Sequence, residues 1–453
     1  MKNIKCRIVV MATTLALAAP LARADTLGDT LAFAYENSGL LEQNRALLRV
    51  ADEDVAVATA NLLPIINWAA TATINEPRLP TTSYVTSQLS ISAELLLFDF
   101  GASRYAIDSQ KEVVLATRES LVNVEQQVLL RAVQAYQNVR TTQEVVILRQ
   151  NNVRVISQEL RAAQDRFDVG EVTRTDVSLA ESSLALARSQ LAAAEGDRMQ
   201  AVEEFRVAVG RPPRNLQPAP IAPLSRNVEQ AKAYAVRNHP LVLAAQRNVS
   251  AAELLILRAE AAMKATVTLN GRVGVNDDLV GATQLGVTVA GPIYQGGRLS
   301  ALARQAMARR DAQRAGLHTT SQNVEQTVGN AYALLDVARA RRDASGRQVS
   351  AARQAFEGVR EEATLGARTT LDVLNAEQTQ LDAQANLITA RADEVTASYA
   401  VLSSMGLLTA ARLGLPVQVY DPAAYYNLVR DNPTVMSPQG RALDRVLQAI
   451  GKE

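Results

Sequence analysis

The chain has 453 residues, of which 48% are hydrophobic, 21% charged and only 4% aromatic. Its 47 basic and 46 acidic residues give a formal net charge of +1, which excludes the strongly basic character of a nucleic-acid-binding protein. So low an aromatic content favours long, closely packed helices over a bulky globular core.

The first 24 residues have the features of a secretory signal peptide. Basic residues precede an apolar run over 8–19, and the Ala-Arg-Ala sequence at 22–24 resembles a cleavage site. The only cysteine, Cys6, precedes the apolar run, so it is not a lipoprotein acceptor, and cleavage would remove it. Because the leader also holds four basic and no acidic residues, the mature chain would carry 43 basic and 46 acidic residues, a net charge of −3, without disulfides or thiolate metal sites.

Helical and strand patterns alternate along the rest of the chain. In order, they predict a helix over 40–62, a strand hairpin over about 65–98, a long helix over 102–168, a turn at Gly170 and a helix over 173–209. A second series predicts a helix over 241–263, a strand hairpin over about 265–292, a long helix over 298–365, a turn at Gly366 and a helix over 369–404.

The two series are copies of one unit, because identical residues recur at an offset of 196. The matched pairs include Gly101 and Gly297, Tyr136 and Tyr332, Gly170 and Gly366, Asp176 and Asp372, and Gly210 and Gly406. Repeat one therefore spans 25–210 and repeat two 226–409, joined by a proline-rich connector over 211–225. The tail, 410–453, has no counterpart, and we expect it to pack around the outside.

Each long helix would extend for about 100 Å at 1.5 Å per residue. Helices of this length need equally long partners in a coiled-coil arrangement, so we expect two shorter helices to stack end to end beside each one. The first long helix has no glycine, whereas the second contains Gly316, Gly329, Gly346 and Gly358. Each glycine costs up to about 1 kcal/mol relative to alanine, so this helix either bends or closely approaches a neighbour.

The strand hairpins alternate apolar and polar residues, and no later apolar stretch is long enough for an uninterrupted membrane helix, so any membrane span must be made of strands. Four strands cannot close a membrane barrel, which needs about eight. A dimer would supply eight strands and a trimer twelve; only the trimer leaves an obvious water-filled bore. Four aromatic residues lie at the helix-side ends of the strands, as expected of an interfacial belt in contact with membrane lipid: Trp68, Phe98, Phe100 and Tyr294.

The two glycine turns are the sharpest local signals. Gly170 and Gly366 would each end a helix, and Thr173 with Asp176, like Thr369 with Asp372, resembles a capping box. In a trimer each aspartate would form a ring of three carboxylates, although the sequence leaves open whether these face the bore. Arg368 would either pair with an acid across the subunit boundary or remain a solvated surface residue.

Catalytic chemistry has little support. His239 and His318 lack the spacing of a metal site or a catalytic triad, and both are expected to be surface or helix-packing residues. We therefore expect no catalytic residue, no metal and no cofactor, and a protein that is not an enzyme.

The chain resembles the TolC-like outer-membrane efflux protein family over essentially the whole mature sequence. The resemblance rests on the doubled unit, the sequences Phe98-Asp99-Phe100-Gly101 and Ile293-Tyr294-Gln295-Gly296-Gly297, the Ala135-Tyr136 and Ala331-Tyr332 pairs, and the glycine turns. It implies a mainly helical fold, in which a homotrimer shares a twelve-strand outer-membrane barrel that is continuous with a helical tunnel in the Gram-negative periplasm. The implied function is the exit duct of a tripartite efflux or type I secretion system, with a periplasmic adaptor and an inner-membrane transporter as partners.

By position, the resemblance implies that Asp176, Arg368 and Asp372 constrict the periplasmic entrance. Relatives have a second inward acid where this chain has Asn375, and a linking tyrosine where it has Ala363, so we expect a weaker negative ring and a less firmly closed state. The adaptor would dock on the glycine turns, at Gly170, Glu171, Val172, Gly366 and Ala367. The alternative is a periplasmic coiled-coil adaptor or scaffold without a barrel, which the two hairpins and the strand pairs disfavour.

Overall fold

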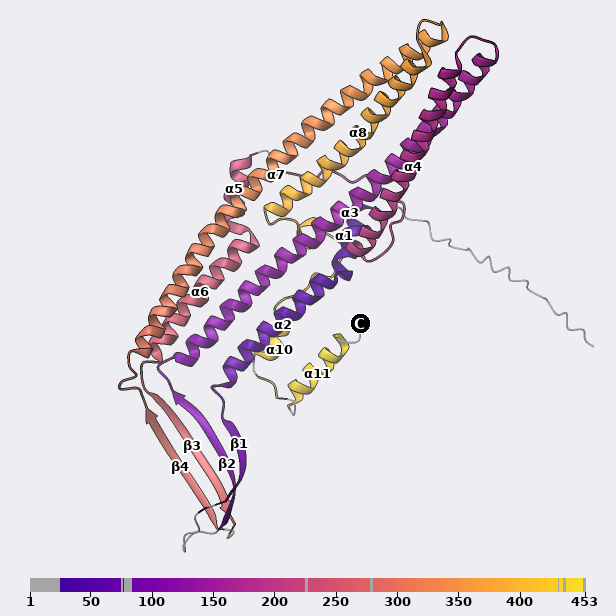
Figure 1. Ribbon diagram of the computed structural model, residues 1–453. Coiled ribbons are helices and arrows are strands. Elements are labelled where there is room, and N and C mark those ends of the chain that lie inside the picture. The colour runs from indigo at the N-terminus through magenta and orange to yellow at the C-terminus, as the bar shows by residue number, and fades with distance from the viewer. Residues whose placement is uncertain are drawn as a thin grey trace, which may run out of the picture.

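The computed structural model describes residues 25–74, 76, 84–224, 227–277, 280–430, 432–434 and 437–450, so the predicted signal peptide lies outside the described residues. The molecule is elongated (Figure 1). A layer of long helices has a four-stranded sheet at one end and two helical hairpin tips at the other.

Two 67-residue helices form the frame: α3 (Ala102–Asp168) and α7 (Arg298–Thr364). Beside α3 lie α2 (Gly39–Ala60) and α4 (Arg174–Val209), and beside α7 lie α6 (Pro240–Ala261) and α8 (Thr370–Ser404). Because α3 also packs against α6 and α8, it occupies the middle of the protomer, whereas α7 lies at its edge.

Two short helices were not predicted. α1 (Leu27–Asn37) precedes α2, and α5 (Val228–Asn238) precedes α6. Their start signals are Thr26, which forms a capping box with Asp29, and Asn227, whose side chain accepts a hydrogen bond from the Gln230 amide. By length and composition Val228–Ala261 could cross a membrane, but His239 divides it into α5 and α6, and both pack against α7.

The sheet is antiparallel in the order β1-β2-β3-β4, with β1 at Ile65–Ile74, β2 at Val85–Phe98, β3 at Thr266–Asn276 and β4 at Gly281–Ala290. The two repeats meet at the β2–β3 pair, where Ser92 lies opposite Arg272. Each hairpin follows a short helix and leads into a long one, so the sheet lies at one end of the helical layer, with its strands inclined to the helices (Figure 1).

The main core lies midway along the layer, where α1, α3, α4, α8 and the connector meet. Tyr136 is completely buried there, and its hydroxyl donates to the carbonyl oxygens of Gln217 at 2.6 Å and Asp25 at 3.1 Å. A second core joins α5, α6, α7 and α8 around Tyr332, the repeat-two counterpart of Tyr136. The two cores place α1 and α5 on the helical layer, and we call the side that they occupy the covered side.

The tail forms α9 (Ala410–Leu413), α10 (Ala424–Val429) and α11 (Pro438–Ile450). α10 packs on α2, where the Tyr425 hydroxyl donates to Glu53 at 2.7 Å. The tail therefore adds to the packing around repeat one.

Of the two alternatives for the α7 glycines, a bend or a close approach to a neighbour, the described part of the protomer does not show the close approach. A Cβ added at Gly316, Gly346 or Gly358 would meet no atom within 4 Å, and one at Gly329 would meet only the flexible side chain of Lys232, at 3.4 Å. These glycines lie where α7 has room, because the edge helix has fewer neighbours than α3.

Candidate channel entrance and membrane surface

The two hairpin tips are built in the same way. Gly170 and Gly366 have φ values of 81° and 76°, a left-handed conformation that glycine adopts without a steric penalty. It folds the chain back, so that the Glu171 amide donates to the Arg166 carbonyl and the Ala367 amide to the Glu362 carbonyl, both at 2.9 Å. The turns therefore close each long helix and direct the chain into the next one.

The predicted capping boxes are confirmed at both tips. The Asp176 carboxylate accepts from the Thr173 amide at 2.9 Å and hydroxyl at 2.7 Å, and Asp372 accepts from the Thr369 amide at 3.0 Å and hydroxyl at 2.8 Å. Hydrogen bonds from Thr173 lower the pKa of Asp176, and those from Thr369 lower the pKa of Asp372. Both carboxylates thus remain charged at neutral and mildly acidic pH.

Arg368 makes its ion pair within its own tip. Its Nε lies 2.8 Å from a carboxylate oxygen of Glu362, and this hydrogen bond raises the pKa of the guanidinium. Glu362 could not be predicted as the partner, because a spacing of six residues does not bring two side chains together on a helix. The turn at Gly366 brings them together here. The ion pair constrains the turn of repeat two. The two tips also differ in sequence just after the turn, since repeat one has Arg174 and Thr175 where repeat two has Thr370 and Leu371.

The remaining predicted entrance positions differ in exposure. Asn375 is exposed on α8, and its backbone carbonyl accepts from the Thr379 hydroxyl at 2.9 Å. Ala363 is buried against Phe356 and Val373, inside the second hairpin.

Apolar side chains project from both tips. Val169 is 72% exposed and Leu365 is 81% exposed, and each precedes its turn glycine. Gly170, Glu171, Gly366 and Ala367 are exposed too, whereas Val172 is half-buried. Val169 and Leu365 occupy matching positions in the two repeats, at the offset of 196 residues. This exposed apolar pair was not among the predicted site residues, although the repeat offset makes it visible in the sequence.

The two hairpins also contact each other below the tips. Leu374 of α8 is buried against Ile156 and Val177 of the first hairpin. Nearby, Asn152 Nδ2 donates to Glu377 at 3.3 Å, and burial raises the pKa of the Glu377 carboxyl. The second hairpin is thus packed on the first, not independent of it.

At the opposite end, the strand register gives the sheet one apolar face. Trp68 lies opposite Ile91, which lies opposite Val273; in the next strand pair, Leu269 lies opposite Val287. The alternate positions form a polar face, lined by Ser90, Ser92, Glu94, Asn270, Arg272 and Thr288. Such a sheet can face lipid on one side and water on the other.

Of the four predicted aromatic residues, Phe98, Phe100 and Tyr294 lie at the helix-side end of this sheet, whereas Trp68 lies opposite Ile91, near the middle of β2. Trp68 and Tyr294 are 76% and 86% exposed, and Phe98 and Phe100 pack edge to face with ring centroids 4.8 Å apart. The Lys264 ammonium lies 5.3 Å from the Phe100 ring centroid. Within the described residues, no group of three or more histidine, cysteine or acidic side chains is placed to hold a metal ion.

A helical layer with charged, capped tips at one end and an amphipathic sheet at the other defines the class of outer-membrane channel proteins. The sequence matches the outer membrane efflux protein family twice, over residues 32–211 and 234–407, and the chain belongs to this family. The duplicated match agrees with the two repeats, and the predicted fold class and outer-membrane location are confirmed, while the adaptor alternative is not supported.

Curated relatives match nearly the whole chain. The outer membrane efflux protein BepC of Brucella suis is 36% identical over 450 residues, covering 96% of this chain and 98% of the relative. The outer membrane protein TolC of Escherichia coli is 23% identical over 398 residues, covering 81% and 79%. The alkaline protease secretion protein AprF of Pseudomonas aeruginosa is 25% identical over 354 residues, covering 74% and 72%.

Solved structures share the fold. The outer-membrane protein CusC has a TM-score of 0.75 at 18% identity, covering 84% of this chain and 92% of the other. The MtrE outer membrane channel of Neisseria gonorrhoeae, in its open state, has a TM-score of 0.72 at 20% identity, covering 84% and 89%. Together with the family match and the curated relatives, this fold identifies the protein as an outer-membrane efflux channel.

Proposed function

We propose that three copies of this chain form one exit duct, in which a twelve-strand barrel crosses the outer membrane and the helical layers close into a periplasmic tunnel. The observation that carries the proposal is the sheet: it has an apolar face, and β1 and β4 are its two edges. Exposed strand edges pair with other strands, and a membrane sheet must be closed because unpaired backbone groups are costly in lipid. Pairing β4 of one copy with β1 of the next satisfies both edges.

In this arrangement the covered side of each helical layer, with α1 and α5, faces outward. The other side, which we call the open side, lines the bore. The tail lies on the covered side too, because α9 contacts α1. A bore surrounded by three layers has no room for three tails, whereas the periplasm does. The polar face of the sheet would continue the water-filled path through the barrel.

The tips would form the periplasmic entrance. Asp176 and Asp372 supply two fixed negative charges per chain, so three copies place six carboxylates around the opening, where they favour cations. The Arg368–Glu362 pair holds the second turn in shape. Val169 and Leu365, next to the predicted docking residues Gly170, Glu171, Val172, Gly366 and Ala367, offer an apolar surface for a periplasmic adaptor, which would join the duct to an inner-membrane transporter.

The aromatic residues Phe98, Phe100 and Tyr294 would lie at the periplasmic boundary of the membrane, since they occupy the helix-side end of the sheet, whereas Trp68 would lie further into the lipid-facing surface. The relatives' names include an outer membrane efflux protein and an alkaline protease secretion protein, so similar chains serve both efflux and protein secretion. We assign this chain the passive duct, with cargo selected by its transporter.

The test is conductance through the purified trimer in planar bilayers. We expect a small, cation-preferring conductance, and the double change Asp176→Asn and Asp372→Asn should abolish most of the cation preference. Gln378→Ala, which alters a neighbouring exposed α8 hydrogen bond to Asp382 without removing a charge, is the matched control. An unchanged reversal potential in the double variant would show that these carboxylates do not face the path of the ions.

A further inference from the structure

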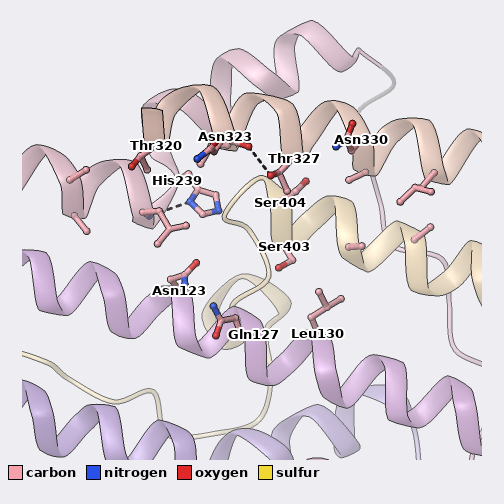
Figure 2. A pocket seen from close by; sticks show the side chains of 18 of the residues that line it. Asn123, Gln127, Leu130, His239, Thr320, Asn323, Thr327, Asn330, Ser403 and Ser404 are labelled. Carbon is pink, nitrogen blue, oxygen red and sulfur yellow. Dashed lines mark hydrogen bonds between the residues drawn. The ribbon is translucent and has the colours of Figure 1, made fainter. Parts of the chain in front are cut away.

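A large recess lies on the open side of the helical layer, midway along the protomer. It has a volume of about 1140 Å³ and lies between α3 and α7, at the level where α8 ends and α6 begins. In Figure 2, Asn323 and Thr327 of α7 lie on one side, Asn123 and Gln127 of α3 lie on the other, and His239 and Ser403 lie between them. Its size is that of a cavity for a drug-sized molecule.

The spacing on α7 shows that the recess and α5 occupy different faces. Residues 320, 323, 327, 330 and 334 line the recess and recur at intervals of three and four, which is one helical stripe. Lys232 of α5 instead approaches Gly329, which at about 100° per residue lies about 140° around the helix from the middle of this stripe. The recess therefore opens on the side away from α5, which in the proposed trimer is the bore.

The lining carries almost no net charge. Its only acidic and basic members, Asp393 and Arg341, form an ion pair at 3.3 Å. Burial lowers the pKa of His239, and its Nδ1 accepts a hydrogen bond from the Leu241 amide, so the ring is a neutral helix cap. This differs from the tips, where carboxylates stand at the surface.

The polar groups of the lining are mainly side-chain amides. Those of Asn123, Gln127, Asn323 and Asn330 form no hydrogen bond with another residue in the described part of the chain, so they can serve a visiting molecule. Each amide offers both donors and an acceptor. Between them lie exposed aliphatic side chains, at Leu241, Leu334 and Val337.

We propose that this recess is a transit site that holds uncharged amphiphilic molecules, those with amide or hydroxyl groups on an apolar frame, during their passage through the duct. The inference rests on the proposed function, because the recess must face the bore. Charged cargo gains nothing from a neutral lining and loses hydration there, whereas an uncharged amphiphile exchanges water for amide hydrogen bonds and aliphatic contact.

Gly316 provides a means to fill the recess. It lies in the α7 lining, and an added Cβ would meet no atom within 4 Å, so a side chain can start from this position without a clash at the helix surface. Gly346 on the same helix has the same open surroundings but lies outside the recess. Gly316→Trp and Gly346→Trp are therefore a matched pair.

The experiment is equilibrium dialysis of chloramphenicol, which is uncharged and carries an amide and two hydroxyls, against trimers in nanodiscs, with empty nanodiscs as background. We expect saturable retention of three molecules per trimer, about tenfold weaker binding in Gly316→Trp and in the double variant Asn323→Leu and Asn330→Leu, and unchanged binding in Gly346→Trp. The cation ethidium and the anion nalidixate should be retained at least tenfold less well.

Retention equal to that of empty nanodiscs, equal binding by the two tryptophan variants, or equal retention of the charged compounds would each overturn the proposal. Bilayer conductance of the same preparations separates this failure from that of the duct itself. A conducting trimer that retains no chloramphenicol refutes the transit site alone, whereas a trimer that does not conduct refutes the function on which it rests.

Discussion

The helices α3 and α7 have the same length and the same place in their repeats, but different surroundings. Of their 67 residues, 17 are buried in α3 and 11 in α7, and all four glycines of the pair lie in α7. The central helix contacts five other helices of the layer and its covering, while the edge helix contacts α5, α6 and α8. The two repeats thus form helices of the same length. Their positions in the protomer differ, so that α3 is largely packed into the core whereas α7 keeps more exposed surface.

The largest expected effect comes from truncating leucines on the two helices. Leu129 of α3 is completely buried, so Leu129→Ala should cost about 2–5 kcal/mol through lost burial and the cavity left behind. Leu334 of α7 is 65% exposed, and Leu334→Ala should change stability by less than about 0.5 kcal/mol. Denaturant unfolding followed by helical circular dichroism measures both, and equal losses would contradict the contrast between the helices.

Tyr136 of α3 and Tyr332 of α7 occupy matching positions in the two repeats, so removing each hydroxyl group compares the two helices at a single site. Tyr136→Phe removes the hydroxyl that donates to the Gln217 carbonyl, while the Asp25 carbonyl keeps the Gln217 amide as a donor, and the change should cost about 1–3 kcal/mol. Tyr332→Phe removes a contact of 3.9 Å to the Met405 sulfur, which is a weaker acceptor than a carbonyl oxygen, and should cost less than Tyr136→Phe. The same unfolding curves give both changes in stability. A larger loss of stability in Tyr332→Phe than in Tyr136→Phe would contradict this prediction.

The covering of repeat one by the tail should depend on pH. Asp52 of α2 is buried, and burial raises its pKa from 3.8 to about 6, partly offset by Arg118 at 3.9 Å and reinforced by Glu53. The folded protein therefore binds more protons than the unfolded chain between these values, so stability falls as pH rises from about 4 to about 6. Asp52→Asn should raise stability at pH 7.5 and flatten this dependence.

Hydrogen exchange of residues 424–429, which form α10 on α2, measures this effect locally. Wild type should show slower exchange at pH 5 than at pH 7.5 after correction for the intrinsic rate, and Asp52→Asn should show no such difference. A wild-type profile that slows with rising pH would contradict the sign.

The smallest expected effect concerns a glycine on the open side. Gly316→Ala adds a methyl group where an added Cβ meets no atom, so it should stabilise α7 by about 0.5–1 kcal/mol. Gly366→Ala, in which φ is 76°, should instead destabilise the protein. If both changes were destabilising, α7 would have a neighbour at Gly316 that a single protomer lacks.

Much of this architecture follows from the sequence, because each part has a local physical signal. The long helices come from runs without proline, the tips from Gly170 and Gly366 with their threonine caps, and the strands from alternation. The short helices α1 and α5 were not predicted, because each has only 11 residues, too few to show a clear helical periodicity of apolar residues. The Arg368–Glu362 ion pair and the recess could not be predicted from the sequence, because both depend on how the chain folds back in three dimensions.

The central claim is that the side of the layer away from α5 faces the bore, and cysteine labelling tests it directly. The mature chain has no cysteine if the leader is removed, so Gly316→Cys and, on α5, Glu229→Cys each introduce a single thiol. A bulky cationic methanethiosulfonate reagent should react at both sites, because Glu229 is exposed and the recess is open. We predict that labelling lowers single-channel conductance in Gly316→Cys and leaves it unchanged in Glu229→Cys; the reverse pattern would contradict the account.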